Sequence, residues 1–376
     1  MTSKLDSLCV YAKGKVSVES LNAKTYISTE NMMPNKGGVE AASSLPSVQY
    51  TQQYLKGDVL VSNIRPYFKK IWLAEYDGGC SNDVLVFRAN RICSPTFLYY
   101  VLANDLFFDY ATATSKGTKM PRGDKTAIMQ YDVPNFEMED QLRIGNLLRG
   151  LDERIIINKK INDNLQQQAF SVFDNLIANA ESNDYTVSDY AFLNPKRTLA
   201  KNQVARSIDM SQLSTSGAFP SGWDMKPFNG GMRFTNGDTL LARITPCLEN
   251  GKTAFIDFLD DGEVAFGSTE YIVLAPKNDT PPEMLYCLAR YPAFVDYAVK
   301  NMNGSSGRQR VSAETVGQYR LPLFDKHSLV LFKEIVSPMF LKMRYNSLEN
   351  MRLTELRDAL LPKLMSGEID VSAIKL

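Results

Sequence analysis

Short apolar runs recur along the chain in a fixed order. Val59-Leu60-Val61 and Val84-Leu85-Val86-Phe87 are bounded by Gly, Asp and Asn, which predicts buried strands. Pro95 to Tyr110 is apolar at helical spacing and predicts a helix. Residues 115–125 are rich in Gly, Lys and Arg and predict a loop. Residues 1–137 therefore read as one mixed α/β domain.

The same order returns in the second half of the chain. Leu240-Leu241-Ala242 and Tyr271-Ile272-Val273-Leu274 predict strands, Pro282 to Tyr297 predicts a helix, and residues 301–312 predict a polar loop. The turn before the first strand is repeated almost literally, as Gly57-Asp58 and Gly237-Asp238. A repeated half of roughly 185 residues is a domain plus a helix, because solenoid units have only about 20–50 residues.

A long helical segment follows each domain. Residues 138–182 carry a heptad seam, with steps of three and four between seam positions. The seam comprises Leu148, Leu151, Ile155, Asn158, Asn162, Leu165, Ala169, Val172 and Leu176. Shifting it by 188 gives Val336, Met339, Met343, Asn346, Asn350, Leu353, Arg357, Leu360 and Leu364. Pro338 predicts that the second helix begins near it or kinks there.

Asparagine occupies the seam twice in each helix, at Asn158, Asn162, Asn346 and Asn350. A polar seam residue costs stability but fixes register and partner geometry. The alternative is that these side chains face solvent on an ordinary packed helix. Their recurrence at the same seam positions favours a role in register.

These patterns predict an α+β chain with a pseudo-twofold internal repeat. Two similar mixed α/β domains, 1–137 and 183–325, are each followed by a spacer helix, 138–182 and 326–376, the latter including a C-terminal tail. Each helix would be about 60 Å long at 1.5 Å per residue. The repeat predicts that the two helices pack as an antiparallel coiled coil between the domains.

Composition narrows the function classes. Lys+Arg and Asp+Glu both number 42 in 376 residues, so the formal net charge is zero. A stand-alone DNA-binding protein is usually basic, so any basic surface must be local or completed by partners. No window is long and apolar enough to predict a membrane span. Five scattered cysteines without a Cys-x-x-Cys pair predict reduced thiols and a cytoplasmic protein.

Candidate catalytic motifs fail on their spacing. Gly251-Lys252-Thr253 resembles the end of a phosphate-binding loop, but Pro246 stands where that loop needs its first Gly. His327 is the only histidine and lies where a domain meets a helix, which disfavours Ser-His-Asp, Cys-His and metal sites. We therefore predict no catalytic residues, no metal ligands and no cofactor on this chain.

Three polar stretches are candidate DNA-binding loops: Asn63 to Lys70, Ser115 to Lys125 and Lys300 to Ser312. Cations neutralise phosphate, Arg pairs with guanine, and Asn or Gln pairs with adenine. An ordinary solvated surface is the alternative, although equivalent loops in both copies disfavour it. Arg243 and Thr245 are added because they align with Asn63 and Arg65 in the repeat. The candidate residues are Asn63, Arg65, Tyr67, Lys69, Lys70, Lys116, Thr118, Lys119, Arg122, Arg243, Thr245, Ser305, Ser306, Arg308, Gln309 and Arg310.

Several of these motifs resemble the specificity subunit of type I restriction–modification enzymes. The resemblance covers essentially the whole chain. It is carried by Gly57 to Lys70, Gly79 to Val86, Lys116-Gly117-Thr118-Lys119-Met120-Pro121-Arg122, Asn158 to Leu165 and Leu360 to Ile369. In the second copy Gly304-Ser305-Ser306-Gly307-Arg308-Gln309-Arg310 replaces the Lys116–Arg122 loop.

The resemblance implies two target-recognition domains that each bind one half of an interrupted, double-stranded DNA site. It implies that the helix pair sets the spacer and docks two modification subunits, which carry S-adenosylmethionine and methylate adenine. Restriction subunits would add ATP- and Mg-dependent translocation and cleavage.

Two other functions stay open from the residues alone. One is an autonomous two-headed DNA-binding adaptor without a methyltransferase partner, and the other is a protein scaffold whose basic loops bind nothing.

Overall fold

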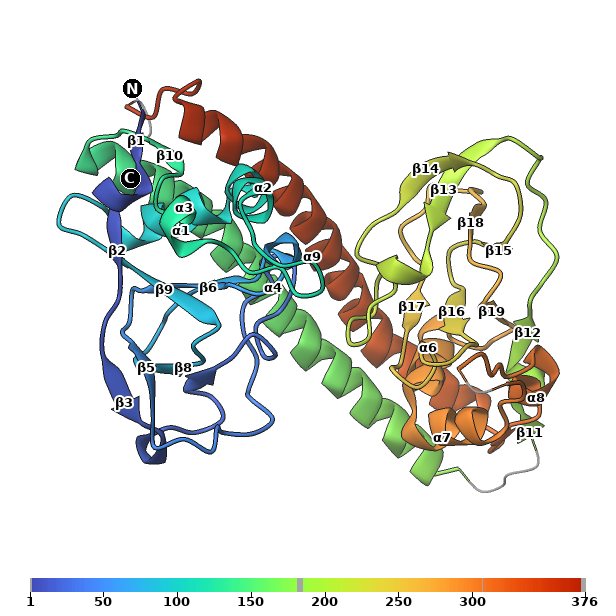
Figure 1. The fold of residues 1–376 in the computed structure, drawn as a ribbon. Coiled ribbons are helices and arrows are strands. Elements are labelled where there is room, and N and C mark those ends of the chain that lie inside the picture. The colour runs from blue at the N-terminus through green and yellow to red at the C-terminus, as the bar shows by residue number, and fades with distance from the viewer. Residues whose placement is uncertain (1, 181–184, 306, 373–376) are drawn as a thin grey trace. The chain divides into compact units, whose positions relative to one another are not determined.

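The computed structural model describes residues 2–180, 185–305 and 307–372. The chain divides into two compact units, Met1–Glu153 with Thr354–Leu376, and Arg154–Leu353 (Figure 1). Each unit contains an α/β domain and parts of two long helices, α4 (Met138–Ala178) and α9 (Lys326–Ser366). We call the parts before α4 and between α4 and α9 the first and second domains. The sequence-based boundary at 182–183 lies outside the described residues.

The first domain has two four-stranded sheets and a two-stranded pair, β1 (Thr2–Lys4) with β10 (Asp132–Pro134). The first sheet has the order β2 (Cys9–Tyr11), β9 (Val84–Ala89), β6 (Val59–Ser62) and β7 (Ile71–Leu73). The second sheet has the order β3 (Lys15–Ser17), β5 (Tyr50–Tyr54), β8 (Gly78–Cys80) and β4 (Tyr26–Ile27). Only β4 and β8 pair in parallel among these strands.

Strand β6 is buried throughout because both of its faces are covered. Val59 and Val61 join the core beneath the helices, whereas Leu60, one residue out of phase, joins the core between the two sheets. Strand β9 alternates in the same way, with Phe87 in the first core and Val86 in the second. The domain is therefore a stack of helices, sheet and sheet, and the period of two decides which core receives each side chain.

The second domain repeats this stack. Its first sheet has the order β12 (Ala191–Leu193), β19 (Tyr271–Pro276), β16 (Thr239–Ala242) and β17 (Thr253–Phe255). Its second sheet has the order β14 (Asp224–Pro227), β13 (Val204–Ile208), β18 (Ala265–Gly267) and β15 (Met232–Phe234). A two-stranded pair joins β11 (Tyr185–Thr186) and β20 (Arg320–Leu321).

The second sheets of the two domains differ at one strand. Both contain a parallel pair, β4 with β8 and β13 with β18, flanked by an antiparallel strand, β5 or β15. The fourth strand joins opposite edges, because β3 pairs with β5 whereas β14 pairs with β13. The repeat therefore preserves a three-stranded centre and varies the edge.

Each helix predicted over the first sheet is in fact two short helices. In the first domain α1 (Pro95–Ala103) ends at Asn104, whose side chain accepts the N–H of Leu106 and caps α2 (Asp105–Ala113). In the second domain α6 (Pro282–Arg290) and α7 (Pro292–Lys300) are separated by Tyr291, which is extended. The residue before a proline disfavours the helical conformation. Short helices α3 (Lys125–Ile128), α5 (Val187–Tyr190) and α8 (Ala313–Gly317) complete the domains.

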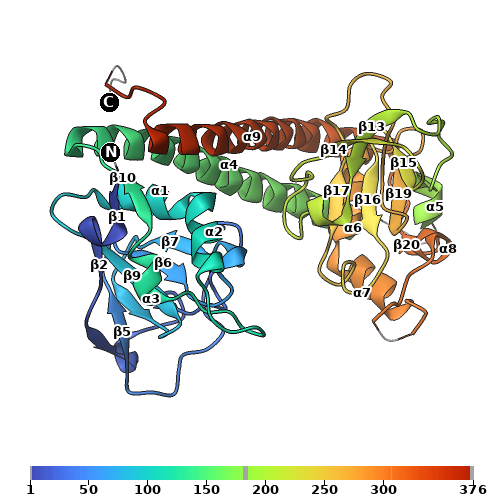
Figure 2. The ribbon, with the colours of Figure 1, turned by 45° about the horizontal axis from the view of Figure 1, so that its top comes forward.

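The two long helices pack antiparallel within each unit (Figure 2). In the second unit Asn162 pairs with Asn346 and Asn158 with Asn350. The residue numbers increase along α9 as they decrease along α4, which is the pattern of an antiparallel pair. This confirms the antiparallel helix pair. Pro338 lies inside α9, which begins at Lys326, so the helix does not begin near the proline. The alternative, a kink at Pro338, stays a prediction.

Candidate nucleic-acid interface

Two of the predicted DNA-binding loops lie against each other in the first domain. The segment from Lys116 to Arg122, here called the first hairpin, closes on itself through two backbone hydrogen bonds of 2.8 and 2.9 Å between its ends. The N–H of Arg65 donates to the carbonyl of Pro121 at 2.8 Å, and the N–H of Gly123 donates to that of Asn63 at 3.1 Å. The loop after β6 and the first hairpin thus form one surface.

The second domain holds its two loops together with the same pattern of backbone hydrogen bonds, here called the frame, but uses different residues. The segment from Asn303 to Arg310, the second hairpin, is closed by two backbone bonds of 2.9 Å. The N–H of Thr245 donates to the carbonyl of Gln309, and the N–H of Val311 to that of Arg243, both at 3.0 Å. These positions correspond to Arg65 with Pro121 and Gly123 with Asn63 in the first domain.

A half-buried lysine contact also recurs. Lys70 precedes β7 and donates to the carbonyl of Thr29 at 2.6 Å. Lys252 precedes β17 and donates to the carbonyl of Met210 at 2.7 Å. Because Thr29 and Met210 follow the equivalent strands β4 and β13, each lysine fastens the loop of one sheet to the other sheet.

Each hairpin ends in an arginine that pairs with a carboxylate just before a strand. Arg122 lies 3.2 Å from Asp83, before β9. Arg310 pairs with both carboxylate oxygens of Glu270, before β19, at 2.7 and 2.8 Å. The guanidinium of Arg310 holds the pKa of the Glu270 carboxyl below its usual value.

The predicted residues of the first domain differ in how far DNA could reach them. Lys116, Thr118, Lys119 and Arg122 on the first hairpin are exposed, as is Tyr67. Arg65, Lys69 and Lys70 are half-buried, and Asn63 is only 7% exposed. Asn63 contributes backbone hydrogen bonds to the frame, and its side chain is buried.

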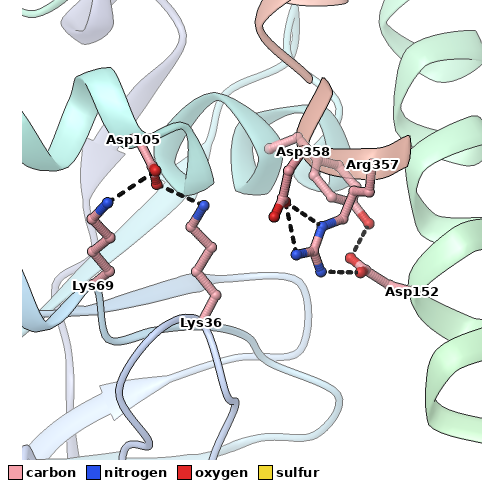
Figure 3. A network of polar contacts seen from close by, with 7 residues as sticks. Lys36, Lys69, Asp105, Asp152, Arg357 and Asp358 are labelled. Atoms are coloured by element: carbon pink, nitrogen blue, oxygen red, sulfur yellow. Dashed lines mark hydrogen bonds and ion pairs between the residues drawn. The ribbon is translucent and has the colours of Figure 1, made fainter. Parts of the chain in front are cut away.

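Two of these lysines already have carboxylate partners. Lys69 lies 2.9 Å from Asp105 at the start of α2, and Lys36 lies 2.8 Å from the other oxygen of the same carboxylate (Figure 3). Lys116 lies 2.5 Å from Asp124 and lowers the pKa of that carboxyl. Lys119, at the tip of the first hairpin, is exposed.

In the second domain Ser305 and Arg308 are exposed, whereas Gln309, Arg310, Arg243 and Thr245 are half-buried. Arg310 donates its Nη1 to the carbonyl of Arg308 in addition to its bonds with Glu270. Ser306 lies outside the described residues.

Sequence reasoning missed the residues that hold this frame. Asp83, Glu270 and Lys252 were not among the candidates, although the internal repeat contained the signal. Ser81-Asn82-Asp83 and Ser268-Thr269-Glu270 both place a serine two residues before an acid, directly before a strand. Aligning the repeat beyond its literal matches would have found both acids.

The seam asparagines contact one another across the helix pair. The Nδ2 of Asn346 donates to the Oδ1 of Asn162 at 2.8 Å, and the Nδ2 of Asn158 donates to the Oδ1 of Asn350 at 2.9 Å. In the first unit the seam residue Arg357 pairs with Asp152 at 2.8 Å (Figure 3). A role in register stays a prediction.

Other chemistry finds little support in the described part of the chain. No group of three or more His, Cys, Asp or Glu side chains is placed to hold a metal ion there. None of the helices within the described ranges is long and apolar enough to span a bilayer.

The chain is similar to curated proteins of one kind. A scan against protein-family profiles finds no match. The HindI type I restriction enzyme specificity subunit of Haemophilus influenzae is 23% identical, over 92% of this chain and 94% of its own length. The MjaIX specificity subunit of Methanocaldococcus jannaschii is 21% identical, over 74% and 70%. The EcoAI specificity subunit of Escherichia coli is 32% identical over 34% of this chain and 22% of its own length.

A solved structure shares the fold. The type I restriction–modification S subunit from M. genitalium superposes with a TM-score of 0.60 at 18% identity, covering 97% of this chain and 96% of that one. This likeness shows that the chain shares the fold of that S subunit. The resemblance to type I specificity subunits that the sequence carries is confirmed.

Proposed function

We propose that this chain is the DNA-recognition subunit of a type I restriction–modification complex. Each domain binds one half of a bipartite site in double-stranded DNA, and catalysis is left to partner subunits. The observation that carries the proposal is the repeated frame. Two domains hold the same two loops in the same backbone register but present different side chains from them.

The charge distribution of the frame supports the proposal. Lys119 and Arg308 project from the hairpins as exposed cations, although the chain as a whole has no net charge. Local cations suit phosphate, and the neighbouring Thr118, Ser305 and Gln309 offer groups that pair with base edges. The neutral remainder fits a subunit that binds DNA together with others.

The partners we propose are two modification subunits that methylate adenine with S-adenosylmethionine, and restriction subunits that use ATP and Mg²⁺. The long helices carry exposed apolar side chains that such partners could cover. Ile156, Ile157, Leu331, Ile335 and Leu341 are 42 to 54% exposed along α4 and α9. Exposed apolar side chains in such number on two helices favour contact with other proteins.

Methylome sequencing with and without this gene tests the function. Adenine methylation at a bipartite site should be present with the gene and absent without it. The purified chain alone, given S-adenosylmethionine and DNA, should transfer no methyl group. Sequence-specific DNA binding without any gene-dependent methylation would favour the autonomous adaptor, and absence of DNA binding would favour the scaffold.

We also propose that the helix pair sets the distance between the half-sites. Half-sites on one face of DNA lie about 34–36 Å apart per turn. One heptad inserted into α4 adds about 10 Å and preserves the seam. The half-sites should stay the same while the gap grows by up to about three base pairs at 3.4 Å each. A folded, methylating insertion mutant with an unchanged gap would show that another element sets the spacer.

A further inference from the structure

The carboxylates of Asp83 and Glu270 occupy equivalent places in the two domains. Each lies directly before a central strand, and each accepts the backbone N–H of the loop after β6 or β16 at its own carbonyl. Those bonds are Asn63 to Asp83 at 2.8 Å and Arg243 to Glu270 at 3.0 Å. Each acid is thus fixed by the sheet at its backbone and extends its side chain toward the hairpin.

The arginines they hold are equally fixed at the backbone. Arg122 and Arg310 each close their hairpin, and each forms a β-bridge to the adjacent loop, at Ile64 and Ile244. A pairing that slips by one residue turns a side chain to the other face of a ladder. An ion pair between sheet and hairpin therefore resists such a slip, because only one register brings arginine and acid together.

The two pairs are unequal in strength. Arg310 presents its Nε and Nη2 to both oxygens of Glu270, and the two side chains are 38% and 26% exposed. Arg122 meets Asp83 at 3.2 Å, and these side chains are 56% and 36% exposed. Bidentate pairs combine charge with a fixed geometry, whereas a looser and wetter pair contributes little.

The unequal pairs match the unequal hairpins. The first hairpin contains Gly117 at φ +95° and also Pro121, whose fixed φ restricts its backbone. The second contains two such glycines, Gly304 at φ +129° and Gly307 at φ +78°, and no proline. The second hairpin is also one residue longer between its bridged ends. A longer hairpin with two glycines and no proline has more conformational entropy to lose on ordering, so it depends more on the ion pair.

We propose that Glu270 and Arg310 are positioning residues for target recognition in the second domain. Arg310 acts through Glu270 to hold the second hairpin in register, rather than by neutralising a DNA phosphate. The proposal rests on the proposed function, since it assigns a role within that same interface. Asp83 and Arg122 form the weaker equivalent in the first domain.

Arg310→Lys separates the two roles of the arginine. Lysine retains the positive charge but lacks the planar fork that meets two carboxylate oxygens. A phosphate contact should survive this change, whereas a bidentate positioning pair should not. Glu270→Gln removes the partner charge and leaves the arginine in place, so both variants should show the same defect.

Two measurements on the full chain test this, and they keep its failure distinct from failure of the proposed function. Hydrogen exchange of the chain without DNA should show the amides of Asn303 and Arg310 exchanging about tenfold faster in either variant, as losing one charge-assisted hydrogen bond implies. The amides of Lys116 and Arg122 should be unchanged. The double variant should be no faster than the single variants, because both remove one interaction.

Methylome sequencing of cells expressing each variant should show relaxed recognition in one half-site only. The salt dependence of DNA binding by the assembled complex should stay as in the unmodified chain. Arg308→Ala, on the same hairpin, should instead weaken binding to all sequences and reduce the salt slope by about one.

The outcomes are decisive for each claim. Unchanged amide exchange in Glu270→Gln overturns the proposal. Unchanged amide exchange and half-site recognition in Arg310→Lys, together with a salt slope reduced by about one in Arg310→Ala, would make Arg310 a phosphate contact. That result also overturns the proposal. Faster exchange without any gene-dependent methylation retains the positioning role and rejects the proposed function.

Discussion

Asn63 in the first domain occupies the place of Arg243 in the second, and both donate a backbone N–H to the carbonyl of an acid that precedes a strand. The hydrogen bonds are the same, but one side chain is an amide and the other a guanidinium. Arg65 and Thr245 are related in the same way. The comparison teaches that the backbone frame is independent of the side chains it displays, which is the property required of a scaffold that recognises different sequences.

The turn before the central strand shows how far this independence extends. Asp58 and Asp238 each follow a glycine with positive φ, Gly57 at +90° and Gly237 at +89°. Each carboxylate accepts the backbone N–H of the residue three positions earlier, Leu55 or Thr235. Asp58 pairs with Arg88 on β9, whereas Asp238 pairs with Arg197, which follows β12. The two domains thus neutralise an equivalent buried carboxylate with arginines from different elements.

Exchange of one domain should have the largest effect. If each frame recognises its own half-site, replacing residues 1–137 with those of a relative should change one half of the methylated sequence completely and leave the other half intact. The reason is that the hydrogen bonds of each frame lie within its own domain. Methylome sequencing of the hybrid measures this. A hybrid that folds and changes both halves, or neither, would refute separate recognition.

Core truncation should distinguish the two units at the level of stability. Leu364 of α9 lies in the core of the first unit, and Phe173 of α4 lies in that of the second. Leu364→Ala should lower the free energy of unfolding of the first unit by about 2–5 kcal/mol, and Phe173→Ala that of the second by about 3–5 kcal/mol.

Trp72 and Trp223, the only tryptophans, lie one in each unit and allow urea unfolding to be followed separately by fluorescence in single-tryptophan chains. Leu356→Ala is the matched control, because Leu356 is 47% exposed on α9, and it should change either value by less than about 0.5 kcal/mol. An equal loss in both units from either core variant would show that the units unfold together.

The sequence predicts the architecture well because the features that specify it are local or repeated. The apolar run at Val59-Leu60-Val61 predicts a buried strand, and a seam shifted by 188 residues predicts two similar helices. The breaks at Asn104 and Tyr291 are harder to predict, because the apolar pattern continues across them while capping and a following proline divide the helix.

The site is predicted less completely than the fold. Exposed cations such as Lys119 can be recognised by composition, but the burial of Asn63 involves its close approach to Gly123, 60 positions away in the sequence. The pairing of Glu270 with Arg310 joins residues 40 positions apart. Charge counting along a loop does not show which cations already have a carboxylate partner.

The buried carboxylate of Asp238 predicts a pH effect in the second domain. Burial raises the pKa of Asp238 to about 6, against the opposing pull of Arg197. A carboxyl whose folded pKa lies above its unfolded value binds more protons when folded, so stability falls as pH rises from about 4 to 6. The contribution is at most about 1.4 kcal/mol per pH unit.

Asp238→Asn removes this titration. Relative to that variant, the unmodified second domain should lose stability as pH rises through this window and show a constant difference above about pH 7. Urea unfolding followed by Trp223 measures the difference. A change of the opposite sign would show that the ion pair with Arg197 outweighs burial.

The smallest expected effect is on the salt dependence of DNA binding, and it concerns the exposed cation that each hairpin carries. Lys119 and Arg308 are exposed cations at equivalent surfaces, so each should contribute a phosphate contact that is indifferent to sequence. Lys119→Ala or Arg308→Ala should reduce the slope of log affinity against log salt by about 0.9 and weaken matched and mismatched sites alike. Lys69→Ala is the control, because Asp105 already neutralises Lys69 at 2.9 Å and its removal should change the slope less. Binding by the assembled complex across a salt series measures all three slopes. If Lys69→Ala lowers the slope as much as Lys119→Ala, the pairing with Asp105 must break on DNA binding, and the exposed and paired cations would then be equivalent.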